Sequence, residues 1–249
     1  MWYDLKKGFM ALWEGWKLLS EMNRRVYLIF PFFLYGFIIM GGLWTFSPWM
    51  SFYIDKATQF MSEFQFMPNF LLWLSEVMIW VLSIIFLVYA LFLLSTVIIS
   101  PFYSLMVEKV LMHLRAIPQE NISWWEIIKR SLKMLWVSLI KAFVFFVVGI
   151  GLFVLSFIPG LNIITSFLFV MILVFDCVDF TFEVYLLNMR QRWSFFQGHI
   201  VEFSGMTVSM GLLLLIPGLN FILYPICIAG GASLVAQLQK NANWSPSRN

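Results

Sequence analysis

The sequence Ile-Pro-Gly-Leu-Asn occurs twice in this chain, at 158–162 within SFIPGLNIITSF and at 216–220 within LLIPGLNFILYP. Pro and Gly are the residues that a helix interior tolerates least, yet both copies lie in strongly apolar surroundings. Each copy therefore predicts a hairpin in which two apolar helices meet at a tight turn. The predicted hairpin tips are Pro159 and Gly160 in the first copy, and Pro217 and Gly218 in the second.

The composition places this turn inside a membrane protein. Of the 249 residues, 61% are hydrophobic and 12% are charged, whereas a soluble domain has about 25% charged residues. Such a chain has too little polar surface to face water on all sides. We expect an all-α integral membrane protein that forms a single membrane domain over 1–249, with no room for a separate soluble catalytic module.

Two long apolar runs predict transmembrane helices. The run at 26–46 contains no charged residue and is long enough to cross the hydrocarbon core. The run at 69–99 is longer than a span needs, and only Glu76 interrupts it, so we expect this helix to be tilted or to project from the bilayer. Its helical pattern resumes after Pro101 and continues to about residue 114. Residues 47–68 are predicted to form an external loop with a short surface helix.

Two amphipathic segments predict helices that lie in the membrane surface. Residues 4–21 carry one apolar stripe. Residues 122–139 show the same amphipathic pattern and predict a second, basic surface helix. The apolar stripe of the first segment consists of Leu5, Phe9, Leu12, Trp16 and Leu19, and its opposite side carries Lys7, Glu14, Lys17 and Glu21.

The two hairpins are predicted at 142–175 and 205–236. Their arms (142–157 with 163–175, and 205–215 with 221–236) are shorter than the about 20 residues of a span, which favours re-entrant hairpins that enter and leave on one side. The alternative is a pair of ordinary spanning hairpins with external turns. Paired interrupted helices of this kind mark the binding site in many transporters.

The distribution of basic residues predicts the topology. All but one of the 16 Lys and Arg residues lie outside 47–68, on the face that both termini share. By the positive-inside rule both termini are cytoplasmic, and so uneven a distribution argues against a dual topology. The polar residues that precede the first apolar run predict that the chain has no cleavable signal peptide.

The sequence contains no constellation typical of an enzyme. We find no nucleophile motif, zinc-protease motif or nucleotide-binding loop, so we expect no catalytic residue, no cofactor, no metal site and no nucleic-acid partner. His113 and His199 stand alone in their segments, and Cys177 and Cys227 are predicted to be buried as small hydrophobic residues.

Several stretches of the sequence, by their order and spacing along the chain, resemble the CysZ-type sulfate permeases within the wider etoposide-induced protein family. They run from the N-terminus to about residue 235: GF at 8–9, GWKLLS at 15–20, Arg24-Arg25, Pro31, SPFYSLMVEKV at 100–110, FIPGLN at 157–162, FDCVDFTFE at 175–183 and IPGLNFILYPICIAGGA at 216–232. The resemblance implies two long spanning helices, two hemi-penetrating hairpins, a homo-oligomer in the bacterial inner membrane, and movement of sulfate into the cytoplasm for cysteine synthesis.

The resemblance also implies a sulfate-binding turn before the first span. In that family a Gly-hydrophobic-Arg-Arg turn stands there, and this chain has Asn23, Arg24, Arg25 and Val26. Arg25 falls on the first arginine of the motif, whereas Val26 replaces the second. Guanidinium groups suit oxyanions, although an arginine pair beside a span also serves as a membrane anchor. Glu108 matches an acidic position of the internal polar network of the family.

Other polar residues have two readings. Asn162 and Asn220 can line the anion route or simply cap the second arm of each hairpin. Asp176, Asp179 and Glu183 share one helical face, which predicts either a cation site or, as we favour, a solvated or ion-paired face near Arg190 and Arg192. Glu76 is expected at the outer headgroup level, or in proton coupling.

Two functions remain open at this stage. The first is an oxyanion permease, most simply for sulfate, in contact with the lipid bilayer. The second is a non-transporting membrane subunit or organiser of the same fold that binds a protein partner through its surface helices and hairpins.

Overall fold

The computed structural model describes all residues except 23–25, 63–68, 119–142, 217–218 and 242–249. The described residues form helices and turns without a strand, which confirms the predicted all-α class. The helices at Ile29–Ala57, Asn162–Val184 and Ile222–Lys240 are long and apolar enough to cross a membrane. The basic helix predicted at 122–139 lies outside the described residues.

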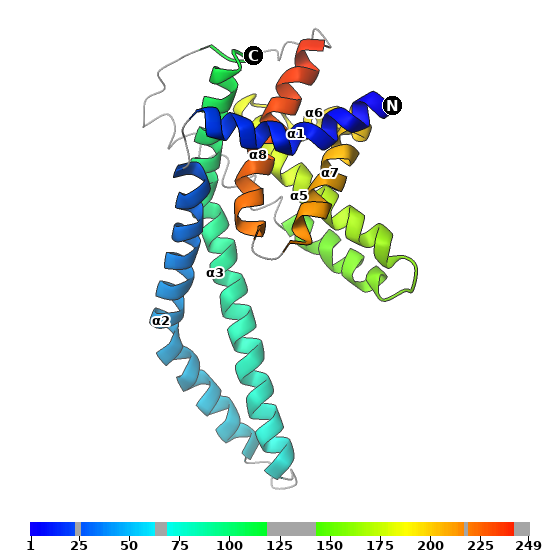
Figure 1. Cartoon of the computed structure of the whole chain (residues 1–249). Coiled ribbons are helices and arrows are strands. Elements are labelled where there is room, and N and C mark those ends of the chain that lie inside the picture. The colour runs from blue at the N-terminus through cyan, green and yellow to red at the C-terminus, as the bar shows by residue number, and fades with distance from the viewer. Residues whose placement is uncertain (23–25, 63–68, 119–142, 217–218, 242–249) are drawn as a thin grey trace. The chain divides into compact units, whose positions relative to one another are not determined.

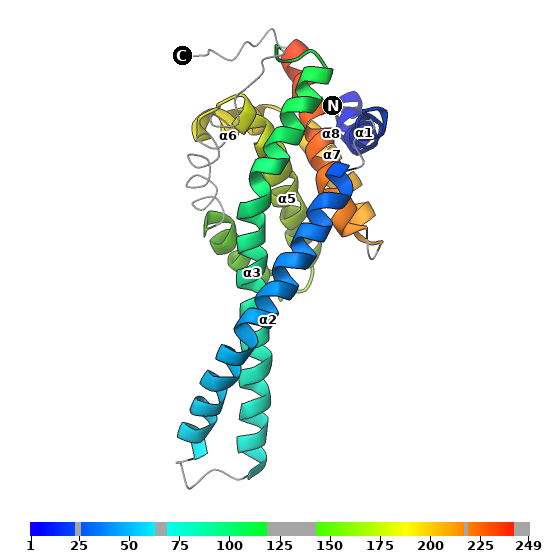
Figure 2. The ribbon, with the colours of Figure 1, turned by 90° about the vertical axis from the view of Figure 1, so that its left-hand side faces the viewer.

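The chain divides into two compact units, and we describe each by itself. One unit, Pro31–Ile99, contains most of α2 (Val26–Ser62) and of α3 (Asn69–His113). Within it the two helices lie side by side (Figures 1 and 2), and Gly42 of α2 leaves room for the side chain of Leu91.

Helix α2 continues to Ser62, well past the end that was predicted at residue 46. Pro48 lies within this helix, although proline lacks the N–H that would bond the carbonyl of Trp44. In the structure the hydroxyl of Ser47 donates a hydrogen bond to that carbonyl (3.3 Å). The neighbouring hydroxyl thus compensates for the proline, and the helix continues.

The other unit consists of residues 1–30 and 100–249 and contains both hairpins. In the first hairpin the helix Phe143–Ser156 packs against α5 (Asn162–Val184) through Phe145 and Phe175, whose ring centroids are 6.1 Å apart. In the second, α7 (Ile200–Leu214) is followed by α8 (Asn220–Asn241). The short helix α6 (Met189–Gly198) joins the two hairpins.

The hairpin arms are longer than predicted. We expected the second arm of hairpin 1 to end near Phe175, but α5 continues to Val184. Likewise α7 begins at Ile200 rather than 205 and α8 continues to Asn241 rather than 236. The carboxylates that follow Phe175 do not end α5, because each of them has a partner within the protein. Helices α5 and α8 are therefore long enough to cross a membrane, so their lengths do not favour re-entrant hairpins.

Helix α1 (Trp2–Glu21) crosses the second hairpin through glycines (Figure 1). Gly8 lies against the backbone of Glu202, and Gly205 lies against the backbone of Leu5, so α1 and α7 meet without intervening side chains. Gly15 and Gly230 allow the same close approach between α1 and α8. The glycines of the GF, GWK and AGGA stretches are thus needed for backbone-to-backbone packing.

This packing changes the predicted faces of α1. The buried residues are Gly8, Ala11, Leu12, Gly15, Leu18 and Leu19. Phe9 and Trp16, which we predicted on the same stripe as Leu12 and Leu19, are more than 40% exposed. The predicted stripe is thus divided between Leu12 and Leu19, which pack within the protein, and Phe9 and Trp16, which lie on its surface.

Candidate functional site

The acidic face of α5 lies at the centre of the described polar interactions. Asp176, Asp179 and Glu183 are spaced at i, i+3 and i+7 and face neighbouring helices rather than solvent. Asp179 and Glu183 are buried, at 0% and 3% exposure, while Asp176 is half-buried. A carboxylate is costly to bury unless it is paired or hydrogen-bonded, so each partner is informative.

Asp179 forms a buried ion pair with Arg192 of α6. The Nη1 atom of Arg192 lies 2.7 Å from Oδ1 of Asp179, and their side chains are 4% and 0% exposed. The Nε atom of the same guanidinium donates to the carbonyl of Leu187 at 2.8 Å. The predicted ion-paired reading of this face is therefore confirmed at Asp179, and a solvated face is wrong there.

The connection between α5 and α6 explains how Arg192 reaches α5. Leu186 adopts a positive φ of 58°, and the N–H of Leu187 bonds the carbonyl of Phe182 at 3.0 Å. This Schellman-type ending turns the chain sharply. Asn188 then starts α6, and its N–H donates to the side-chain oxygen of Gln191 (2.9 Å), so Arg192 in the first turn of α6 faces Asp179.

Asp176 connects the two hairpins. The hydroxyl of Tyr224, near the start of α8, donates a hydrogen bond of 2.6 Å to Oδ2 of Asp176. The ring of Tyr103, on α3, packs edge to face against Tyr224 and against Phe180 of α5. Hairpin 1, hairpin 2 and the C-terminal part of α3 therefore meet at this position.

Glu183 faces the C-terminal part of α3. The hydroxyl of Ser104 donates to Oε2 of Glu183 at 3.3 Å. Glu108, half-buried, follows Ser104 by four residues, so both lie on one face of α3. The predicted network residue Glu108 thus lies one turn of α3 from Ser104, the residue that contacts Glu183. We call Ser104, Asp176, Asp179, Glu183, Arg192 and Tyr224 the polar seam.

The first hairpin tip is formed as the sequence indicates. Gly160 has a φ of 91°, a conformation that glycine adopts without strain. Asn162 does not cap α5, contrary to one of the two predicted readings, because Leu161 occupies the N-cap position. Instead, Oδ1 of Asn162 lies 3.5 Å from the hydroxyl of Ser166. Asn220 begins α8, while Pro217 and Gly218 are outside the described residues.

Glu14 was predicted on the outer charged side of α1, but it faces α8. Its Oε2 atom accepts hydrogen bonds from Ser233 (3.0 Å) and from Gln237 (2.7 Å). These hydrogen bonds begin about one turn of α8 beyond the contact between Gly15 and Gly230. No sequence signal marked this contact, since it depends on how α1 is rotated over the hairpin.

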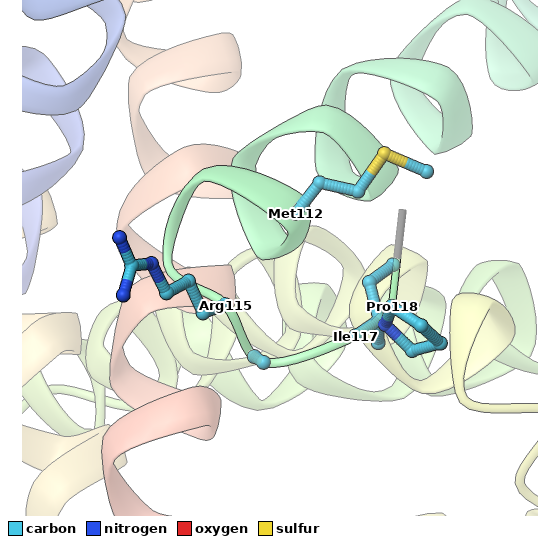
Figure 3. A pocket seen from close by; sticks show the side chains of 5 residues that line it. Met112, Arg115, Ile117 and Pro118 are labelled. Atoms are coloured by element: carbon cyan, nitrogen blue, oxygen red, sulfur yellow. The ribbon is translucent and has the colours of Figure 1, made fainter. Parts of the chain in front are cut away.

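An open hollow of about 450 Å³ lies at the end of α3 and is lined by Met112, Arg115, Ala116, Ile117 and Pro118 (Figure 3). Figure 3 shows the guanidinium of Arg115 on the opposite side of the turn from Met112 and Pro118. Arg115 supplies the only charged side chain among these lining residues.

The predicted anion site, Asn23, Arg24 and Arg25, lies outside the described residues, as does Lys141. Of the other predicted residues, the structure brings Glu108 close to the polar seam and places Gly160 and Asn162 at a hairpin tip. Cys177 and Cys227 are buried, as predicted, and neither is part of a disulfide. The contributions of Tyr224 and Ser104 were missed, because neither residue type is distinctive in an apolar helix.

These features define a class: a helical membrane protein in which two apolar hairpins and a further helix meet at a buried polar seam. The sequence profile of the family described as "Sulfate transporter CysZ/Etoposide-induced protein 2.4" matches residues 11–225. The chain belongs to this family. The family description names a transporter, which agrees with the prediction that the chain is not an enzyme.

Similar proteins carry the same description. The chain is 25% identical to the sulfate transporter CysZ of Pseudomonas fluorescens over 90% of both chains. It is 28% identical to the sulfate transporter CysZ of Pectobacterium atrosepticum, over 95% of this chain and 86% of the relative. The corresponding protein of Pseudomonas aeruginosa is 24% identical, over 90% of this chain and 92% of the relative.

Proposed function

We propose that this protein is a sulfate permease of the bacterial inner membrane that supplies cytoplasmic sulfate for cysteine synthesis. The observation that carries the proposal is the family match over most of the chain, together with relatives named as sulfate transporters. The polar seam between two apolar hairpins is the kind of interior that a transport protein needs.

In this proposal α2 and α3 span the bilayer, and the two hairpins enter and leave it on the cytoplasmic side. The arrangement of the unit that contains both hairpins supports this. The turn of the first hairpin and the C-terminal end of α7 lie on the same side of α1, which runs across the hairpin helices rather than along them (Figures 1 and 2). A transverse amphipathic helix suits the membrane surface, so the tips would point into the bilayer. Both termini are then cytoplasmic.

The charges of the polar seam support an anion site outside the seam. Among the described residues Arg192 is the only buried Lys or Arg, and Asp179 neutralises it. Asp176 and Glu183 contribute further carboxylates to the seam. A sulfate therefore needs cations from elsewhere, and the turn of Asn23, Arg24 and Arg25 at the start of the first span supplies two guanidinium groups. We propose that this turn holds the anion and that Glu108, Asn162 and Asn220 lie along its route.

The function is tested by uptake of radiolabelled sulfate into proteoliposomes that contain the purified protein, with protein-free vesicles as the baseline. We expect saturable uptake that other tetrahedral oxyanions inhibit and chloride does not. Uptake equal to that of protein-free vesicles, for protein shown to be folded and inserted, would contradict the proposal. An organiser role would then be tested by co-purification of a stoichiometric protein partner.

We further propose a homo-oligomer in which all protomers have the same orientation, as the uneven distribution of Lys and Arg supports. Accessibility of a C-terminal tag from one side of intact membranes tests this orientation. Equal accessibility from both sides would contradict it.

A further inference from the structure

The exposed side of α1 carries an aromatic stripe that no described part of the protein covers. Trp2, Phe9, Trp13 and Trp16 recur along one line of the helix, and each is between 42% and 79% exposed. The line lies away from the glycine face that packs against α7 and α8. A helix that faces water rarely exposes so many aromatic side chains in one line. Trp favours the headgroup region of a bilayer.

The charge beside this stripe is positive. Lys6 and Lys17 border the aromatic line and are exposed; Lys17 has only an exposed contact of 3.6 Å with Glu21. Glu14, one of the two acids beside Lys17 on the helix, faces inward and accepts two hydrogen bonds from α8, whereas the other, Glu21, stays exposed. The rotation of α1 that the glycines fix therefore withdraws a negative charge from the exposed side and leaves the lysines there.

We propose that this side of α1, defined by Trp2, Lys6, Phe9, Trp13, Trp16 and Lys17, is a docking surface for anionic phospholipid headgroups. The tryptophan rings enter the headgroup region, and the two ammonium groups bind lipid phosphates with negative net charge. Each lysine near a bilayer surface favours anionic lipid by about 1 kcal/mol, a local enrichment of about fivefold. The inference concerns lipid and does not depend on which anion the protein transports.

The test uses a fluorophore on Ser20→Cys, because Ser20 lies on the aromatic line and is exposed. The two native cysteines are buried, so a maleimide label goes to the new residue. The full-length protein is reconstituted in mixed vesicles that contain brominated phosphatidylglycerol or, in a parallel sample, the same amount of brominated phosphatidylcholine. We expect several-fold stronger quenching by the anionic brominated lipid, and this preference should weaken as salt is raised.

Matched variants separate charge from position. The double variant Lys6→Gln with Lys17→Gln should lose the preference for the anionic lipid. The control Lys109→Gln with Arg115→Gln removes one exposed cation of α3 and one in the turn that follows it, and it should retain the preference. A label on Lys240→Cys, at the end of α8, should be quenched by neither lipid. Equal quenching of the Ser20 label by both lipids would overturn the proposal. Energy transfer between labels on two copies, without quenching by lipid, would assign the stripe to a second copy and would overturn it as well.

Discussion

At the scale of single residues, Arg192 is the clearest structural determinant. Its guanidinium bonds a carboxylate of α5 and the carbonyl of Leu187 in the turn between α5 and α6. A buried pair of this kind contributes little net free energy when intact, but removing one partner leaves an uncompensated charge in the interior. Arg192 therefore holds the orientation of α6 more than it adds to stability.

This account predicts the effect of breaking the pair. Arg192→Ala and Asp179→Ala should each lower the free energy of unfolding by about 3–5 kcal/mol, measured by thermal or denaturant unfolding in detergent. The control Arg190→Ala removes an exposed arginine on the same helix and should change stability by less than about 0.5 kcal/mol. The double variant Asp179→Leu with Arg192→Leu should recover part of the loss. Equal stability of the two single variants and the control would contradict the account.

Tyr185 gives a prediction of pH dependence. Burial raises the pKa of its hydroxyl to about 12 from an ordinary value of 10.0, because the charged phenolate is poorly solvated there. The folded state thus keeps this proton more tightly than the unfolded state, so the contribution to stability is full below pH 10 and is lost as the pH rises toward 12. Tyr185→Phe should reduce the loss of melting temperature over that range. If the melting temperature of Tyr185→Phe fell with rising pH as steeply as that of the native protein, the prediction would be contradicted.

At the scale of elements, the sequence was sufficient for the existence of the helices but not for their ends or faces. Apolar runs and the two Pro-Gly pairs predicted the helices and the first tip. The predicted end of α5 was wrong at a carboxylate that has a partner, since Asp179 pairs with Arg192. The predicted end of α2 was wrong near Pro48, where the hydroxyl of Ser47 bonds the carbonyl of Trp44. The polar seam could be predicted only in part. Tyr224 bonds Asp176 and Ser104 bonds Glu183 only because segments that are distant in the sequence pack together.

The crossing of α1 over the second hairpin predicts the effect of adding a Cβ atom. Gly8→Ala and Gly15→Ala place a methyl group onto the backbone of α7 or α8, which neither helix can avoid without shifting. We expect a loss of about 1–3 kcal/mol or more in unfolding experiments. The control Gly151→Ala fills open space within a helix and should stabilise slightly, by up to about 1 kcal/mol. Similar stability of all three variants would show that α1 does not cross the hairpin at its glycines.

At the scale of the whole molecule, the question is whether the hairpins cross the bilayer. If they are re-entrant, a cysteine at Ile163, which is 81% exposed beside the first tip, lies within the membrane. Ile163→Cys should then resist labelling by a membrane-impermeant maleimide added outside intact cells, whereas Lys56→Cys, predicted outside, should be labelled. The buried native cysteines provide a low background. Labelling of Ile163→Cys from outside, at the rate of Lys56→Cys, would show that the hairpin spans the membrane.

The central claim is that this protein moves sulfate through a site at the Asn23–Arg25 turn, since the only buried cation among the described residues is already neutralised. The most direct measurement is the initial rate of radiolabelled sulfate uptake into proteoliposomes by native protein, Arg25→Ala and Arg190→Ala, at matched amounts of inserted protein. The account predicts saturable uptake by the native protein and by Arg190→Ala, and a rate near that of empty vesicles for Arg25→Ala. Uptake by Arg25→Ala at the native rate and with the native saturation would contradict it.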